Sequence, residues 1–385
     1  MGRKQYKTDV FRSLASFEEQ PLLTDGQKVD RPYRSDIVVE NYTKGTALTA
    51  QDLTATTDVL TVATIKAALL YVDNVDAIQN KYSAVNLWAD EAGRRLSIAT
   101  DADFLYEVFS ANDTIDDGDI GGTAGNGITG STSNIADIFG AINMKMDANN
   151  LPDENRCFVI SPQFRRTLWL FIQGKQSMLG DKSGENGMIG EYGGLKLFRS
   201  NNLTGSARWT PADDPSNTAT ITINGITFTF VSSIGTTAGN ILIAGTVAGT
   251  IDNLVALING GGVTSDAGVS NVSLSTANQR TVQDWVAVDG TTYIEVRAKG
   301  ASYLTVSTSE AADVWTATRQ VQNLAAMLKG AVDVVVQKNP TVLMDSTVGA
   351  GKAGMNILPM TLWGKKTFNQ GANEIFRVEM RSDAY

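Results

Sequence analysis

The sequence contains no histidine and only one cysteine among its 385 residues. Without histidine, the chain cannot form a Ser–His–Asp or Cys–His catalytic pair, nor a zinc site that needs an imidazole ligand. A single cysteine also excludes an intrachain disulfide. That residue, Cys157, stands in the apolar run RCFVIS. Because free cysteine in such surroundings behaves as a small buried hydrophobe, we expect Cys157 to lie in the core rather than to act as a catalytic thiol.

Long apolar runs and clustered positive charges are also missing. No segment approaches the ~20 apolar residues of a membrane-spanning helix, and the N-terminal residues lack the apolar core of a signal peptide. We therefore expect no membrane partner and a protein assembled in a cytoplasm. The net charge is −9, with acidic and basic residues interspersed. Tight nucleic-acid binding needs many neutralised phosphates, so a dedicated DNA-binding protein is disfavoured.

Glycine is abundant, and the segment 111–134 is rich in both glycine and acidic residues. Its glycines Gly125, Gly127 and Gly130 fit the pattern G-x-G-x-x-G. The dinucleotide-binding fingerprint, however, requires a buried strand directly before the first glycine. Acidic, turn-rich sequence stands there instead, so we interpret the segment as a mobile surface loop without a cofactor.

The same loop contains part of a calcium-binding pattern. Asp113, Asp117 and Gly118 have suitable types and spacing, but Ile115 occupies a position that needs an oxygen ligand. We predict no metal site, no cofactor and no catalytic residue in this chain.

Local patterns predict the secondary structure of the first half of the chain. Residues 1–35 lack periodicity, and Pro32 disfavours helix before it, which indicates an extended arm. Residues 36–72 alternate like strands around a polar tip at 49–57. Such a hairpin is marginal alone in water, so we expect it to lie against another subunit. Residues 82–109 are predicted to form one long helix. Its apolar stripe comprises Val85, Trp88, Ala92, Leu96, Ala99, Ala102 and Tyr106.

A helix, a strand and a second helix follow the glycine-rich loop. Residues 135–146 repeat apolar side chains at helical spacing, and 156–161 read as a buried strand. Ser161 is a suitable N-cap and Pro162 a suitable first residue for the second helix. Arg165 and Arg166 fall on its polar side, which we expect to face solvent or another subunit.

Residues 206–322 interrupt this pattern and predict an inserted β-rich module. Asn224–Gly225 is a strong hairpin signal between two alternating runs. A short helix is expected after a cap at Thr250, and a second hairpin is expected to turn at Lys299–Gly300. The flanking segments 204–217 and 316–323 are interpreted as polar linkers.

Three stretches in this order resemble the major capsid proteins of tailed bacteriophages, which have the Hong Kong 97-type fold. They are NLPDENRCFVISPQFRRTLW (150–169), IGEYGGLKLFRSNNL (189–203) and LKGAVDVVVQKN (328–339). The first two are similar to axial-domain segments of that family, and the third is similar to its returning axial-domain strand. The resemblance covers about 1–205 and 323–385.

The resemblance implies an α+β, Hong Kong 97-like capsid fold with an inserted β-rich domain. The expected parts are an N-terminal arm (1–35), a long hairpin loop (36–75), a spine helix with peripheral domain (76–110), a first axial part (111–205), the insertion (206–322) and returning axial and peripheral strands (323–385).

The resemblance further implies a structural protein, not an enzyme. Copies of it would assemble as hexamers and pentamers into an icosahedral shell around double-stranded phage DNA, which they would contact weakly and without sequence preference. Implied partners are a portal and, because no scaffolding segment precedes the hairpin near residue 36, a separate scaffolding protein; whether a decoration protein binds is left open. The location would be the virion. Lys44 and Lys66 are the hairpin lysines, but no glutamate is marked beside either, so cross-linking is not predicted.

Other functions remain open from the sequence. An encapsulin-like compartment has the same fold, although such shells generally lack so large an insertion. A carboxylate-dependent glycoside hydrolase needs no histidine, but no paired acidic residues are evident. A tail-tube, baseplate or adhesin protein would be dominated by strands and would lack the long helix.

Overall fold

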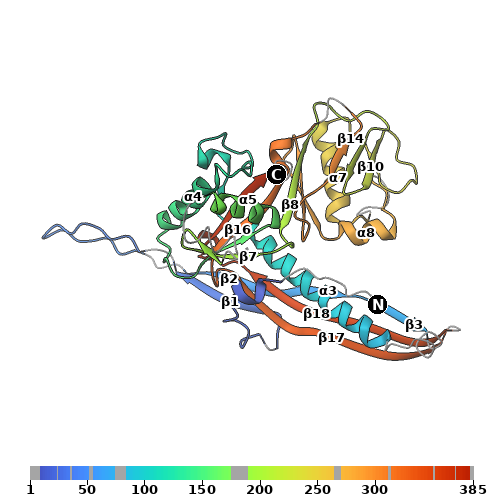
Figure 1. Ribbon diagram of the computed structural model, residues 1–385, viewed down its shortest axis with the longest axis horizontal. Helices are drawn as coiled ribbons and strands as arrows, with labels where there is room; N and C mark the ends of the chain where they lie inside the picture. Colours follow the sequence, from blue (N-terminus) through green and yellow to red (C-terminus); the bar gives the residue numbers. More distant parts are fainter. Residues whose placement is uncertain are drawn as a thin grey trace. The chain divides into compact units, whose positions relative to one another are not determined.

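The computed structural model describes residues 9–23, 25–34, 37–51, 55–73, 84–174, 190–263, 270–310, 314–349, 352–368 and 370–381. Helices and the strands of three sheets are mixed along the chain (Figure 1), so the predicted α+β class is confirmed. The chain divides into two compact units. Unit 1 comprises Met1–Arg12, Ile98–Leu328 and Glu374–Tyr385, and unit 2 comprises Ser13–Ser97 and Lys329–Asn373.

The largest sheet of unit 1 has ten strands, in the order β12-β13-β8-β16-β5-β7-β6, with β15 on β8 and β19 joining β16 to β4. The strands are β4 (Asp113–Ile115), β5 (Arg156–Ile160), β6 (Glu191–Tyr192), β7 (Leu195–Arg199), β8 (Thr204–Thr210), β12 (Trp285–Asp289), β13 (Ile294–Ala298), β15 (Val314–Trp315), β16 (Val321–Leu328) and β19 (Ile375–Arg381). Strand β8 pairs with both β13 and β16. The sheet is therefore continuous between the segment expected as an insertion and its host.

Two helices pack on this sheet as their sequence patterns predict. Helix α4 (Ile135–Ala148) buries the expected apolar face, and its Phe139 ring contacts Phe158 of β5 and Phe164 of α5. Helix α5 (Pro162–Gln173) starts after Ser161, whose side chain accepts a 3.1 Å hydrogen bond from the Phe164 amide. The hairpin β6–β7 turns at Gly193–Gly194, where both residues have positive φ. The predictions for the two helices and for the Ser161 cap are confirmed.

Helix α3 (Ala84–Tyr106) is the predicted long helix, and the 3₁₀ turn η1 (Glu107–Ser110) continues it. Ala92, Leu96 and Ala102 of the apolar stripe are buried. Trp88 is 47% exposed, so the apolar stripe is not buried at this residue, and the side chain of Val85 lies outside the described part of the chain. Residues 100–105 are buried on every side, because this end of α3 lies inside unit 1.

Unit 2 is built on a five-stranded sheet. Its strands are β1 (Lys28–Arg34), β2 (Ala55–Ala67), β3 (Leu70–Asp73), β17 (Asp333–Gly349) and β18 (Lys352–Lys366), in the order β1-β2-β18-β17 with β3 also on β18. The two longest strands, β17 and β18, run side by side (Figure 1). Their pairing shifts register twice, between Val336 and Lys338 and between Lys338 and Thr341, and the second shift spans Pro340, which has no amide hydrogen. The segment 328–339 was expected to return to the axial sheet. That prediction is wrong, because β16 is the strand that pairs with β5, and 333–339 begins β17.

The segment expected as an extended arm contacts its own chain. Beyond the short helix α1 (Phe11–Leu14), the Ser16 amide donates to the Val332 carbonyl, and the Gln20 side chain exchanges two hydrogen bonds with the backbone of Val336. Strand β1 pairs with β2 at seven positions. Pro32 is compatible with this placement because β1 is an edge strand.

Residues 37–51 form an irregular extended loop, not the first strand of the expected hairpin. The loop folds back on itself, because Gln51 exchanges two hydrogen bonds with the backbone of Val38. The turn lies at Lys44–Gly45, where Gly45 has φ 89°. The expected tip at 49–57 lies partly outside the described residues.

The segment 206–322 contains a second sheet, of four strands, and two helices. They are β9 (Thr220–Ile223), β10 (Ile226–Val231), β11 (Asn240–Leu242), β14 (Val306–Thr308), α7 (Val247–Asn259) and α8 (Thr276–Val282). The Asn224–Gly225 hairpin is confirmed, with positive φ at both residues. Two details differ. Helix α7 is capped by Thr246 rather than Thr250, and Lys299–Gly300 joins the two sheets, because β13 pairs with β12 and β8 while β14 pairs with β9.

This segment has a core of its own. Every residue of one hydrophobic cluster lies between Ala207 and Trp315, including the fully buried Trp209, which stacks on Phe230 at 5.4 Å between ring centroids. The segments expected as polar linkers contain β8 and the start of β16, which are buried strands. The segment TGSARWT consists largely of small and hydroxyl side chains. It therefore lacks the alternation of large apolar residues that would have predicted a strand. The boundaries of an independently folding domain remain a prediction.

We expect a fragment of residues 204–316 to melt in one cooperative transition, because it contains the whole cluster. A matched fragment of 211–316 lacks β8 and hence Trp209, whose loss alone costs about 3–5 kcal/mol. It should show no sigmoidal melt by circular dichroism. Equal melts for the two fragments would contradict the role assigned to β8.

Candidate functional site

Cys157 lies in the core, as expected from its neighbours. It belongs to β5, is 1% exposed, and its thiol donates to the Asn155 carbonyl at 3.3 Å. The neighbouring Arg156 is committed to the preceding turn, where its guanidinium donates to Asp147 at 2.7 Å and to the Leu151 carbonyl at 2.7 Å. The predicted place of Cys157 in the core is thus confirmed.

The glycine-rich acidic loop is ordered by its own carboxylates. Asp116 accepts hydrogen bonds from the amides of Gly118 at 2.8 Å and Gly125 at 2.6 Å, and Asp117 accepts one from the Thr123 amide at 2.9 Å. Asp116 caps the 3₁₀ turn η2 (Asp117–Ile120). A mobile loop was expected from the sequence, and this cap was not predicted. The run Asp–Asp–Gly–Asp at the start of the turn was the signal that could have indicated it.

The residues of the two partial motifs do not converge on a ligand. Asp113 accepts a hydrogen bond from the Asn149 side chain at 3.2 Å, whereas Asp117 accepts one from the Thr123 amide. A Cβ on Gly127 would lie 2.3 Å from a methyl group of Val321, so this glycine permits close packing against β16. Across the described ranges, no group of three or more acidic or cysteine side chains could hold a metal ion.

Asp101 of α3 is a buried carboxylate that no local sequence pattern singles out. One oxygen accepts from the amides of Val10 at 2.7 Å and Phe11 at 2.9 Å, and the other accepts from the Asn202 side chain at 2.7 Å. Burial raises the pKa of Asp101 above its ordinary value, although these three hydrogen bonds oppose the shift. This carboxylate fastens the N-terminal segment to α3.

Four partly buried arginines and two buried glutamates form a second polar cluster within unit 1. Glu379 of β19 lies 2.8 Å from both Arg319 and Arg377. Glu295 of β13 lies 3.2 Å from Arg208 and 2.8 Å from Arg297.

The two halves of this cluster meet at an aromatic ring. The Arg297 and Arg377 guanidiniums lie 4.0 Å and 5.0 Å from the centre of the Phe109 ring. Burial would raise the pKa of Glu295, but Arg297, Arg377 and Arg208 outweigh it and lower that pKa. The cluster binds the β8–β13 region to the end of α3 and to β19, which is a structural role.

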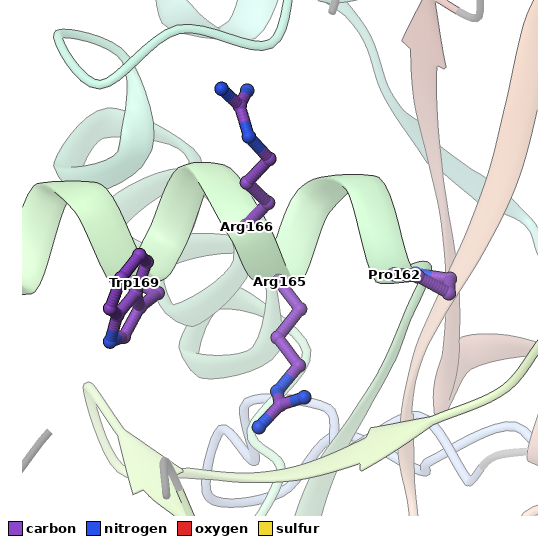
Figure 2. A pocket seen from close by; sticks show the side chains of 4 residues that line it. All are labelled: Pro162, Arg165, Arg166 and Trp169. Atoms are coloured by element: carbon purple, nitrogen blue, oxygen red, sulfur yellow. The ribbon is translucent and has the colours of Figure 1, made fainter. Parts of the chain in front are cut away.

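The exposed side of α5 carries a pocket of about 290 Å³, lined by Pro162, Arg165, Arg166 and Trp169. Figure 2 shows that the two arginine side chains leave the helix in opposite directions, and that Trp169 lies one turn further along. The sequence placed both arginines on the polar side of this helix, and Arg166 is exposed as expected. It did not single out Trp169, although the four-residue spacing from Arg165 was a usable signal.

The hairpin lysines occupy different elements. Lys44 lies in the turn of the 37–51 loop, and Lys66 lies in β2 opposite Thr361.

Among the helices that the structure describes, none has the length and apolar character needed to cross a membrane.

Solved phage structures share this fold over nearly the whole chain. A chain of Mycobacterium phage Che8 matches with a TM-score of 0.57 and 13% identity, over 98% of this chain and 93% of its own. A chain of the cyanophage P-SCSP1u capsid matches with a TM-score of 0.52 and 15% identity, over 99% and 90%. A chain of the bacteriophage PhiM1 mature capsid matches with a TM-score of 0.51 and 12% identity, over 99% and 90%. No protein-family model and no curated protein sequence matches the chain. The resemblance to phage capsid proteins is thus confirmed at the level of the fold.

The Asp101→Asn variant should lose part of the pH dependence of stability. The folded chain holds the Asp101 proton to a higher pH than the unfolded chain, so this group's contribution falls as pH rises from its ordinary value of 3.8 through the raised folded pKa. At neutral pH the variant should lie within about 1 kcal/mol of the wild type. An asparagine keeps one acceptor, and the buried Asn202 Oδ1, which has no partner, can accept from its amide.

Asp101→Ala is the matched variant, since it leaves three buried donors unsatisfied. It should cost about 2 kcal/mol or more. Urea unfolding at several pH values measures both effects, and equal losses for the two variants would refute the hydrogen-bonding role.

Cys157→Ser should leave the protein folded and lower its free energy of unfolding by about 1 kcal/mol, because a hydroxyl replaces a buried thiol. Iodoacetamide should label native Cys157 slowly and the denatured chain rapidly. Rapid labelling of the native protein would contradict its place in the core.

Proposed function

We propose that this chain is the major capsid protein of a tailed bacteriophage, of Hong Kong 97-type fold. Copies assemble as hexamers and pentamers into an icosahedral shell around double-stranded DNA. The observation that carries the proposal is the exposed apolar loop of residues 37–51, in a fold shared with chains of phage capsids.

The loop exposes large apolar side chains that its own chain leaves uncovered. Val39 is 92% exposed and Tyr42 is 66% exposed. The other exposed large apolar residues of the loop are Ile37, Val38 and Leu48. Burying each such side chain is worth about 1.5–3 kcal/mol. A second copy of the chain supplies the missing cover, and closure of a shell makes many such contacts act together.

The net charge of −9 suits a container for nucleic acid. A mostly acidic wall repels phosphates, so DNA enters and leaves without adhering strongly. In this proposal the chain acts in the virion, after assembly in the host cytoplasm. Its partners are a portal, a separate scaffolding protein and the packaged DNA; a decoration protein is not assigned.

The competing functions have less support. An encapsulin-like compartment would share the fold but would enclose enzymes, and the β-rich segment 206–322 argues against it. A glycoside hydrolase would need two facing carboxylates, whereas the buried Glu295 and Glu379 are held by arginines. We assign no catalytic role to the chain. Nucleic acid inside purified particles would separate the genome container from the enzyme compartment.

The double variant Val39→Ser/Tyr42→Ser should leave the protomer's melting temperature unchanged, since the loop adds nothing to the core. It should strongly reduce the yield of closed shells in negative-stain electron microscopy.

The matched control is Met144→Ser/Tyr303→Ser, which removes an apolar residue and a tyrosine that are 58% and 50% exposed elsewhere. It should assemble like the wild type. Normal shells from the loop variant would refute the proposed contact.

A further inference from the structure

We propose that the α5 surface formed by Pro162, Arg165, Arg166 and Trp169 binds the phosphate backbone of nucleic acid. The inference deepens the proposed function and rests on it, since it names the part of the shell protein that contacts the packaged genome.

The first argument is local charge. The chain has a net charge of −9, yet α5, with the sequence PQFRRTLWLFIQ, contains two arginines and no acidic residue. Arg165 and Trp169 also interact with other groups of the chain. A guanidinium stays charged in any such contact. The helix itself therefore carries two positive charges and no negative charge, on a protein whose net charge is negative.

A comparison with α3 shows that adjacent arginines alone do not make such a surface. Arg94 and Arg95 are also consecutive and exposed, but Asp90 and Glu91 lie one turn before them at 3.2 Å and 3.1 Å. Each of those guanidiniums has its own carboxylate within the helix. One turn before Arg165 and Arg166, α5 has Ser161 and Pro162 instead.

The second argument is shape and chemistry. The two arginine side chains diverge around a pocket of about 290 Å³ (Figure 2), so they can meet two separate phosphates of one strand rather than a single carboxylate. Guanidinium groups match phosphate oxygens with paired hydrogen bonds. Trp169 adds a flat aromatic face, on which an unpaired base can stack.

The third argument is rigidity. Ser161 caps α5, and Phe164, Leu168 and Ile172 anchor its opposite face in the core. Gln163, in the first turn, is hydrogen-bonded to the buried Gln322 of β16. The binding groups stand on a fixed helix, so binding orders few backbone atoms.

The test uses the full-length protein and fluorescence anisotropy of a labelled duplex of about 20 base pairs, between about 50 and 200 mM salt. Arg165→Gln/Arg166→Gln should weaken binding and reduce the slope of log K against log salt by about 1.8, as expected for two lost duplex phosphates. Arg94→Gln/Arg95→Gln changes the net charge equally and should leave the slope nearly unchanged.

A single-stranded probe distinguishes the two forms of the ligand. Trp169→Ala should lower single-strand affinity about tenfold through the lost stacking and leave duplex affinity nearly unchanged. Equal slope losses for the two arginine pairs would overturn the proposal, because only general charge would matter. Polyglutamate that competes as strongly as DNA at the same residues would also overturn it, since the occupant would then be an acidic protein segment.

Electron microscopy of the same samples separates this inference from the proposed function. Shells that form while the α5 variant binds DNA normally would refute the site alone. Arginine-dependent DNA binding by a protein that never forms shells would refute the container and leave the site standing.

Discussion

The pairing of β8 with both β13 and β16 is the constraint on which unit 1 depends. It makes one ten-stranded sheet from segments that would otherwise form separate layers. One face of that sheet supports α4 and α5, and thereby fixes the arginine-bearing side of α5. On the other face, the two arginine–glutamate groups join β13 and β8 to β19 and to Phe109. Breaking this pairing would therefore disturb the core, the charged cluster and the α5 surface together.

The sequence predicted those elements whose signals are local. The apolar spacing of α4, the Ser161 cap and the Asn224–Gly225 turn each act within a few residues, and all three are confirmed. The errors concern pairing over long distances. Nothing within TGSARWT shows that Thr204–Thr210 meets residues 294–298 and 321–323, so the strand was interpreted as a linker. Likewise, Lys299–Gly300 has the sequence of a hairpin turn, but β13 does not pair with the strand that follows this turn. It pairs with β12, the strand that precedes it.

The candidate sites show the same division. The lack of histidine in the composition was enough to exclude catalytic mechanisms that need this residue. The apolar neighbours of Cys157 were enough to predict that it lies in the core. By contrast, Asp101 receives its donors from residues about ninety positions before it and about a hundred after it, so no local pattern could identify it. The α5 surface could be predicted only in part. The arginines and the tryptophan are visible at helical spacing, but the pocket between them required the folded helix.

The long separation between paired strands also sets an order of events during folding. Strand β4 must wait for β19, because Thr114 and Arg377 are 263 residues apart. Contacts of such separation close slowly. The β9–β10 hairpin needs only adjacent residues, and it can form while the large sheet is still open. An emerging chain can thus contain a formed β9–β10 hairpin and an unfinished large sheet with unpaired strand edges, which are prone to wrong pairing with other chains. The risk of wrong pairing is greatest before the last strand, β19, has joined the sheet, and a chaperone that covers the unpaired edges would act during that time.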